Sequence, residues 1–151
     1  MPTPPEIDYL ILLYDVARLM RTQADQRARL DGMTRAQWVI LVWLERQPGL
    51  SQNELACLVE VEPITVARLV DRLEARGFVE RRPDPKDRRI RRLHLKAAAE
   101  PLLEKIHAYR REIGATMTEG IDPDAVRHFA ESLVRMKANL VHQVRDTAKA
   151  G

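Results

Sequence analysis

The amino-acid sequence predicts a mainly α-helical protein with one small β-hairpin. Apolar residues recur at three- and four-residue spacing over most of the chain, which is typical of amphipathic helices. Residues 78–95 instead alternate with period two on either side of a Pro- and Asp-rich centre, which indicates two strands and a turn. The 151 residues, 45% of them apolar, are enough for a buried core. No apolar run approaches the roughly 18 residues that span a membrane, so no membrane partner is expected.

Four helices are expected before the hairpin. The first begins at Glu6, and its apolar face consists of Ile7, Leu10, Ile11, Tyr14 and Ala17. Capping boxes at Thr34–Gln37 and Ser51–Glu54 open the second and third helices. Pro63 suits the first position of the fourth. The expected spans are 6–30, 35–47, 52–59 and 63–76.

Two long helices are expected after the hairpin. The first runs from Ala97 to Glu119 and is ended by Gly120. Asp122 is a suitable N-cap for the second, since a proline follows it in the first helical position. The apolar stripe of this last helix consists of Val126, Phe129, Leu133, Met136, Leu140 and Val144.

The segment from Ser51 to Arg76 has the pattern of a helix-turn-helix. Ala56 is small enough for the closest contact between two crossing helices, and Glu60 occupies the turn where glycine is common. The core face of the second helix consists of Val66, Leu69, Val70 and Leu73. The opposite face presents Ile64, Thr65, Arg68 and Arg72, with Pro63 at the start of the helix. Such a face can enter a major groove of DNA.

These exposed side chains suit contacts with DNA. Arg68 can bond guanine O6 and N7 with both arms of its guanidinium, and Ile64 can contact a thymine methyl. Thr65 can reach a phosphate or a base edge, while Arg72 is better placed for a phosphate. The alternative is that the two arginines pair with nearby carboxylates such as Asp71.

The hairpin carries the excess positive charge of the protein. The net charge is +3, and residues 81–96 contain eight basic and two acidic side chains. Such a cluster suggests a polyanion partner, although a solvated charge run is the alternative. The hairpin tip holds Lys86, Asp87, Arg88 and Arg89, and an arginine there can enter a narrow minor groove. Asp87 is expected to brace a neighbouring arginine through a charge-assisted hydrogen bond, with turn formation as the alternative role.

The chain resembles the MarR/SlyA transcriptional regulators. Two motifs carry the resemblance: Arg-Leu-x-Asp-x-Leu at 68–73, and Asp-Pro-Lys-Asp-Arg-Arg at 84–89. The resemblance implies a winged helix-turn-helix with long N- and C-terminal dimerisation helices. It assigns residues 1–33 to an N-terminal dimerisation helix, 34–96 to the DNA-binding domain and 97–151 to C-terminal dimerisation helices. The chain departs from the family at Leu95–Ala99, where the usual helix cap is missing.

The resemblance also implies a function. The protein is expected to be a homodimeric, ligand-responsive repressor that binds a pseudo-palindromic operator in double-stranded DNA, with Arg88 or Arg89 in the minor groove. The single cysteine and the absence of a signal-peptide pattern favour the cytoplasm. The alternative is a nucleoid-type architectural protein or an anti-silencing activator with little sequence choice. A third hypothesis is a protein-interaction module.

The remaining candidate residues concern an effector and the lone thiol. Tyr14, Arg18 and Trp38 are candidates for binding a small aromatic or phenolic effector. Otherwise Trp38 packs in the core and Arg18 is a solvated charge. Cys57 is expected to be a small packed residue. The histidine spacing predicts no metal site, and no motif for a cofactor or for catalysis occurs, so no enzyme activity is expected.

Overall fold

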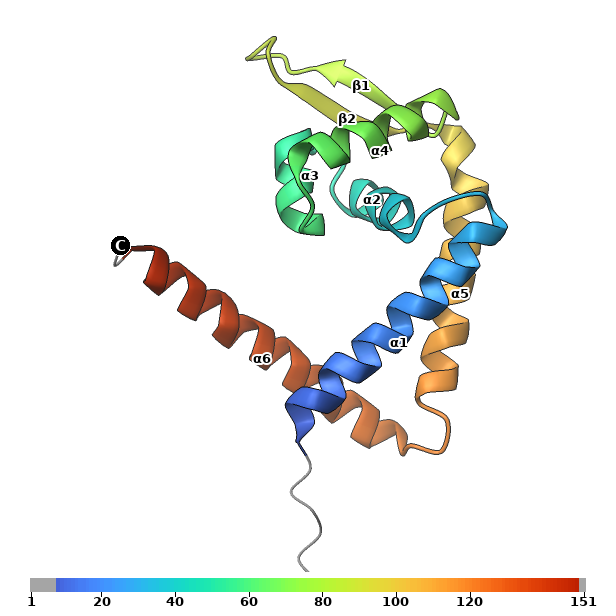
Figure 1. The fold of residues 1–151 in the computed structure, drawn as a ribbon, viewed down its shortest axis with the longest axis vertical. Helices are drawn as coiled ribbons and strands as arrows, with labels where there is room; N and C mark the ends of the chain where they lie inside the picture. Colours follow the sequence, from blue (N-terminus) through green and yellow to red (C-terminus); the bar gives the residue numbers. More distant parts are fainter. Residues whose placement is uncertain (1–7, 150–151) are drawn as a thin grey trace, which may run out of the picture. The chain divides into compact units, whose positions relative to one another are not determined.

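A computed structural model of the chain describes the backbone of residues 8–149 and the side chains of residues 8–143. It confirms the predicted class, a mainly helical protein with a two-stranded antiparallel hairpin (Figure 1). The chain divides into two compact units between Tyr109 and Arg110. The elements are α1 (Tyr9–Leu30), α2 (Arg35–Arg46), α3 (Gln52–Val59), α4 (Pro63–Ala75), β1 (Val79–Pro83), β2 (Arg91–Leu95), η1 (Ala97–Ala99), α5 (Glu100–Met117) and α6 (Pro123–Lys149).

The helix starts follow from local hydrogen bonding. Both predicted capping boxes are present, from Thr34 to Gln37 and from Ser51 to Glu54, each with reciprocal side-chain and backbone bonds. The first helix begins at Tyr9, because the carboxylate of Asp8 accepts hydrogen bonds from the first helical turn. The predicted start at Glu6, like Ile7, lies outside the described residues.

The core of the first unit lies between α2, the helix-turn-helix and the hairpin. Its largest fully buried side chains are Ile40, Leu41, Leu44, Leu55, Val66, Val70, Leu73, Val79 and Leu93. The predicted core face of α4 is therefore buried, as is Ala56 of α3, the helix that packs against α4. Since α4 has one buried face, its opposite face must point outward.

The turn between α3 and α4 is tight. Glu60 caps α3 in the left-handed region, with φ 55°, and is the one non-glycine residue with positive φ in the described part of the chain. This explains why glycine is common at such a position and confirms that the turn here accommodates a side chain.

The hairpin is attached to the helical core along one edge. Leu93 is buried and pairs with Arg81 across the hairpin. Its backbone also bonds to the loop before α3: Leu93 N–H donates to Leu50 O at 2.9 Å, and Gly49 N–H donates to Leu93 O at 2.9 Å. The loop between β1 and β2 projects beyond α3 and α4, as Figure 1 shows.

The two C-terminal helices begin differently. The expected missing cap after the hairpin is confirmed, because Lys96 makes no side-chain cap bond and residues 97–99 form a 3₁₀ turn before α5. In the second unit, the Asp122 carboxylate caps α6 by accepting from two backbone N–H groups. The side chain of Val144 lies outside the described residues. None of the helices in the described part of the chain is long and apolar enough to cross a membrane.

Replacing Glu60 with glycine should raise the free energy of unfolding by roughly 0.5–1 kcal/mol, because glycine adopts a positive φ without a Cβ clash. Urea denaturation at fixed protein concentration measures the change. Glu60→Ala is the matched control, since alanine also removes the charge but keeps the Cβ. Equal stabilisation by both variants would contradict the backbone explanation.

Candidate nucleic-acid interface

The outward face of α4 is free of internal partners. Ile64 is 65% exposed, and Thr65, Arg68 and Arg72 are also exposed. Neither arginine forms an ion pair among the described residues. Pro63 opens the helix at the same end. The structure therefore brings together the five residues that the sequence placed on this surface.

The carboxylates of α4 are held by Arg81 of β1. Its guanidinium contacts Asp71 Oδ1 at 2.6 Å and also pairs with Glu74. It also donates to the Gln52 side chain of α3, with its Nε at 3.0 Å from Oε1. The Arg81 side chain is only 20% exposed. Because Arg81 forms ion pairs with both Asp71 and Glu74, these acids do not pair with Arg68 or Arg72 in the described structure.

Two aspartates shape the wing loop, which comprises residues 84–90. The Asp84 carboxylate Oδ1 accepts from the backbone N–H groups of Lys86 at 2.7 Å and Asp87 at 3.0 Å. The Asp87 carboxylate accepts from the backbone N–H of Arg89 at 2.9 Å. Asp87 thus forms a turn. The prediction that it braces an arginine side chain is wrong, because in the described structure its carboxylate faces a backbone N–H and forms no ion pair.

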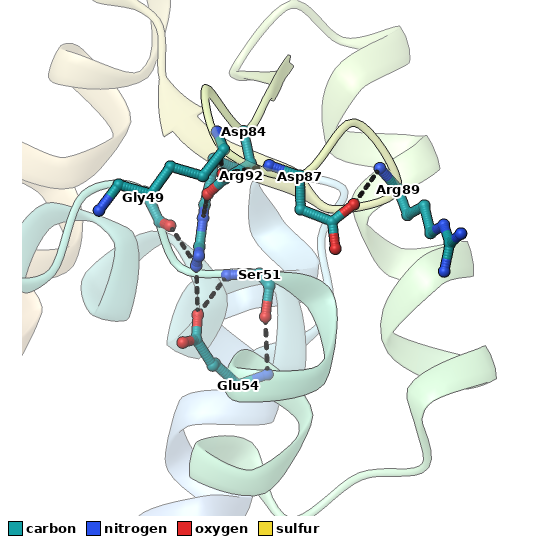
Figure 2. Close-up of polar contacts among 8 residues, drawn as sticks. Gly49, Ser51, Glu54, Asp84, Asp87, Arg89 and Arg92 are labelled. Carbon is teal, nitrogen blue, oxygen red and sulfur yellow. Dashed lines mark hydrogen bonds and ion pairs between the residues drawn. The ribbon is translucent and has the colours of Figure 1, made fainter.

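An arginine is braced instead by Asp84. Arg92 Nε donates to Asp84 Oδ2 at 2.8 Å, and Arg92 Nη1 donates to Glu54 Oε2 at 2.9 Å. The Gly49 carbonyl lies 3.4 Å from the same Nη1. Figure 2 shows Arg92 directed toward Glu54, whereas the Arg89 side chain points away from this group. We refer to Glu54, Asp84 and Arg92 as the Arg92 cluster.

The contacts in this cluster shift the pKa values of both acids downward. The pKa of Asp84 is lowered first by the hydrogen bond from Arg92 and then by the backbone N–H groups of Lys86 and Asp87. The pKa of Glu54 is lowered mainly by Ser51, through its backbone N–H and its side chain, with Arg92 adding a smaller effect. Both carboxylates are therefore stabilised in the charged form.

The basic segment 81–96 thus divides into inward and outward charges. Three of the basic side chains form ion pairs with acids, namely Arg81, Arg92 and Arg82, the last of which pairs with Glu80. The basic side chains without an ion pair in the described structure are Lys86, Arg88, Arg89, Arg91 and Lys96. From sequence alone, all eight basic side chains belong to one cluster that suits a polyanion partner. Charge composition does not distinguish a paired arginine from a free one.

Arg91 is a candidate contact that the sequence reasoning missed. It is exposed, has no ion pair in the described residues, and pairs with Pro83 at the tip end of the strands. Its only signal in the sequence was membership of the basic segment. Together with Lys86, Arg88 and Arg89, it can reach DNA phosphates beyond the helices.

Cys57 is exposed, so the prediction that it is a packed residue is wrong. Leu55 and Ala56 are buried on α3. The residue that follows them is turned by about 100° around the helix axis, since one turn contains 3.6 residues. It therefore faces away from the core.

The effector candidates do not converge within one chain. Trp38 is buried, as the core interpretation predicted, with its ring centroid 5.7 Å from that of Tyr109. Tyr14 is 76% exposed on α1. Arg18 forms an exposed ion pair with Asp15 at 3.3 Å. Neither Tyr14 nor Arg18 shares a hydrogen bond, ion pair or ring contact with Trp38 in the described residues.

The histidines occupy separate positions. His107 lies 2.8 Å from a Glu45 carboxylate oxygen, whereas His94 lies near Gly49 and forms no ion pair with the described residues. The described part of the chain contains no group of three or more metal-binding side chains.

Comparison with known proteins identifies relatives with the same architecture. A sequence model of the MarR family matches residues 33–90. The transcriptional regulator PA3341 is 33% identical over 89% of this chain and 98% of its own, with a TM-score of 0.78. The structure of MarR is 28% identical, covering 90% and 99% of the two chains, with a TM-score of 0.76. The transcriptional regulator SlyA is 26% identical, covering 88% and 94%, with a TM-score of 0.77.

The Arg92 cluster should make stability depend on pH. Folding lowers the pKa of Glu54 and Asp84, so both carboxylates add to the free energy of unfolding when they are charged. This contribution is full above the pKa values of the unfolded chain. It is lost below about pH 5, as the pH falls through the pKa values of the folded chain. Asp84→Asn should therefore lower the Tm at neutral pH, and the difference from the wild type should shrink toward pH 3. Circular dichroism melting across this range measures it. A difference that stays constant with pH would contradict the assignment.

Proposed function

The chain is a DNA-binding transcriptional regulator of the MarR family, and we propose that it acts as a homodimer that binds a specific pseudo-palindromic operator and represses transcription. The observation that carries this proposal is the outward face of α4. Its arginines are exposed and unpaired in the described structure, while the acids of the same helix are engaged by Arg81. A helix with this charge distribution suits the major groove of double-stranded DNA.

The side chains on this face suit sequence readout. Arg68 can form a bidentate contact with guanine, and Ile64 can contact a thymine methyl. Thr65 makes no internal side-chain bond in the described structure, so its hydroxyl is free for a base edge or a phosphate. Arg72, one helical turn after Arg68, would contact the backbone and set the register.

The wing would contact the flanking minor groove. Lys86, Arg88, Arg89 and Arg91 project from the loop or from the strand end next to it, without ion pairs in the described residues. A narrow A·T-rich groove concentrates negative potential and attracts such side chains. Either Arg88 or Arg89 is the candidate for insertion. Asp87 would serve by holding the backbone of the turn.

Exposed apolar side chains support a homodimer. The described residues of α6 include no buried side chain, yet Phe129, Leu133, Met136 and Leu140 form a stripe at helical spacing. The first helix also exposes Leu10, Ile11 and Tyr14. Such faces need a partner in water, and we propose that a second copy of the chain supplies it. Sedimentation equilibrium tests this: a stable monomer at micromolar concentration would contradict the proposal.

We also propose that a small aromatic or phenolic effector releases the operator. Trp38 is buried, and its indole N–H has no hydrogen-bond partner in the described structure. Tyr14 and Arg18 make no contact with Trp38 in the described residues of one chain. They could line the same site only if a second copy of the chain supplies the rest of it. Loss of DNA retention on addition of salicylate, the probe ligand, tests the idea.

Competition between duplexes separates this function from its alternatives. A pool of random duplexes is first used to select the preferred site. A sequence-specific regulator should favour that site over random DNA by at least about a thousandfold. Equal affinity would indicate an architectural protein, and no binding at low salt would indicate a protein-interaction module. Transcription in vitro from a promoter that carries the selected site distinguishes repression from activation.

Arg68→Ala should cost about 1–3 kcal/mol of binding free energy and relax the preference at one base pair of each half-site. Affinity measurements on the selected site and its single-base variants give both quantities. Arg72→Ala is the matched control, because loss of a phosphate contact should weaken all sequences alike and reduce the salt dependence. The same uniform loss for Arg68→Ala would exclude a role in base readout.

Arg88→Ala and Arg89→Ala should weaken binding most where the flanks are A·T-rich, because a narrow minor groove attracts arginine most strongly. Footprinting on duplexes with A·T or G·C flanks measures the difference. Unchanged footprints for both variants would remove the wing from the interface.

A further inference from the structure

Arg92 joins three separate parts of the DNA-binding unit. It lies on β2, and its guanidinium contacts Asp84 of the wing loop, Glu54 of α3 and the carbonyl of Gly49. The Asp84 side chain is only 12% exposed and that of Arg92 is 29% exposed. An arginine held on two carboxylates in this way is directed into the protein, unlike Arg89 of the wing loop (Figure 2).

The same contacts determine the shape of the wing loop. One oxygen of Asp84 accepts from Arg92, and the other accepts from the backbone N–H groups of Lys86 and Asp87. The side-chain contact between Arg92 and the wing loop therefore runs through the carboxylate of Asp84. Rotation of that carboxylate would move both the loop and its arginines.

The other end of the cluster is fixed to the helix-turn-helix. Glu54 Oε2 accepts from Arg92 and also from the Ser51 backbone N–H at 2.7 Å, which is part of the capping box of α3. Helix α3 packs directly on α4. The path from Asp84 through Arg92 to Glu54 therefore links the wing loop to α4, the helix proposed to enter the major groove. The ion pairs are the side-chain part of this link, and the backbone bonds of Leu93 are the other part.

We propose that Arg92 is a positioning residue for DNA recognition. It sets the distance between the bases that α4 reads and the minor groove that the wing enters, and it makes no DNA contact itself. Arg92 therefore determines which spacing between the core half-site and its A·T-rich flank is accepted. The inference rests on the proposed function, because it requires a chain that selects a site with both parts.

The sign of a charge change separates positioning from direct contact. Asp84→Asn and Glu54→Gln each remove a negative charge near the interface, which by itself favours binding to DNA. If Arg92 is a positioning residue, both variants nevertheless weaken binding and relax the spacing. Glutamine retains the capping role of residue 54, so α3 itself is preserved. Glu62→Gln is the matched control, because Glu62 is exposed at the start of α4 and its carboxylate has no bond in the described structure.

Arg92→Lys provides the second discriminating variant. Lysine keeps the charge but cannot bridge two carboxylates with the fixed fork of a guanidinium. A positioning role predicts that the lysine variant loses about tenfold in affinity for the selected site, because the wing loop is no longer held where it can contact the DNA. A direct phosphate contact predicts that lysine retains most of the wild-type affinity.

The experiment selects bound duplexes from a pool in which the core half-site is separated from an A·T-rich flank by variable spacers. The full-length wild type, Arg92→Lys, Asp84→Asn, Glu54→Gln and Glu62→Gln are compared. The expected result is one preferred spacing for the wild type and Glu62→Gln, and a broadened distribution for the other three with unchanged base preference in the core. A single unchanged spacing in those three, or tighter binding by Asp84→Asn, would overturn the proposal.

Hydrogen exchange on the DNA-free proteins tests whether Arg92 anchors the wing loop, independently of whether the protein selects a DNA sequence. Asp84 N–H donates to Ile90 O and Leu93 N–H donates to Leu50 O. Faster exchange at Asp84 and Leu93 in Arg92→Lys, with no change in α5, supports the anchor without any DNA. Unchanged exchange overturns it. A wild type that selects no sequence would instead overturn the proposed function, and the role of Arg92 in recognition with it.

Discussion

The contact of Arg81 with Asp71 and Glu74 is the interaction on which the DNA-binding surface depends. It connects β1 to α4 and, through Gln52, to α3, so three elements share one guanidinium. It also engages the two carboxylates of α4, which could otherwise pair with the arginines on the outward face of that helix. Without this contact, Arg68 and Arg72 would lie beside unpaired acids, and the positive potential of the face would be reduced. A strand residue thus controls the charge that a helix presents.

The arginines of the basic segment serve two different purposes. Arg81 and Arg92 are partly buried and engage carboxylates of the helix-turn-helix, whereas Arg88, Arg89 and Arg91 extend outward. Ion pairs that solvent partly screens contribute only modestly to stability. Their value here is geometric, because each guanidinium fixes the relative position of two elements. The remaining cations are then presented from a surface of defined shape.

The C-terminal unit shows a different constraint. Helix α6 has apolar residues in a stripe, but no described side chain on it is buried. A long helix gains most of its stability from packing of its apolar face, so this stripe favours association with a partner surface. The exposed stripe and the exposed α1 therefore raise the same requirement, which the proposed homodimer meets.

Local signals in the sequence accounted for most of the fold. Capping boxes, Pro63, and the change from helical to strand periodicity depend on residues a few positions apart, and they located the helix-turn-helix and the hairpin closely. The same short-range pattern located the turn at Glu60, and the structure then showed its left-handed conformation. The outward face of α4 was equally predictable, because periodicity alone separates its two sides.

Tertiary structure decided the pairing of charges and the exposure of single residues. Arg92 and Glu54 are 38 positions apart, and Asp84 rather than Asp87 braces the arginine. Cys57 proved exposed because the angular position of one residue on a short helix depends on how that helix packs. The sequence by itself determined the elements, the outward face of α4 and the location of the basic segment. Only the folded chain decided which of those charges face inward, because ion pairs form between side chains that distant segments bring together.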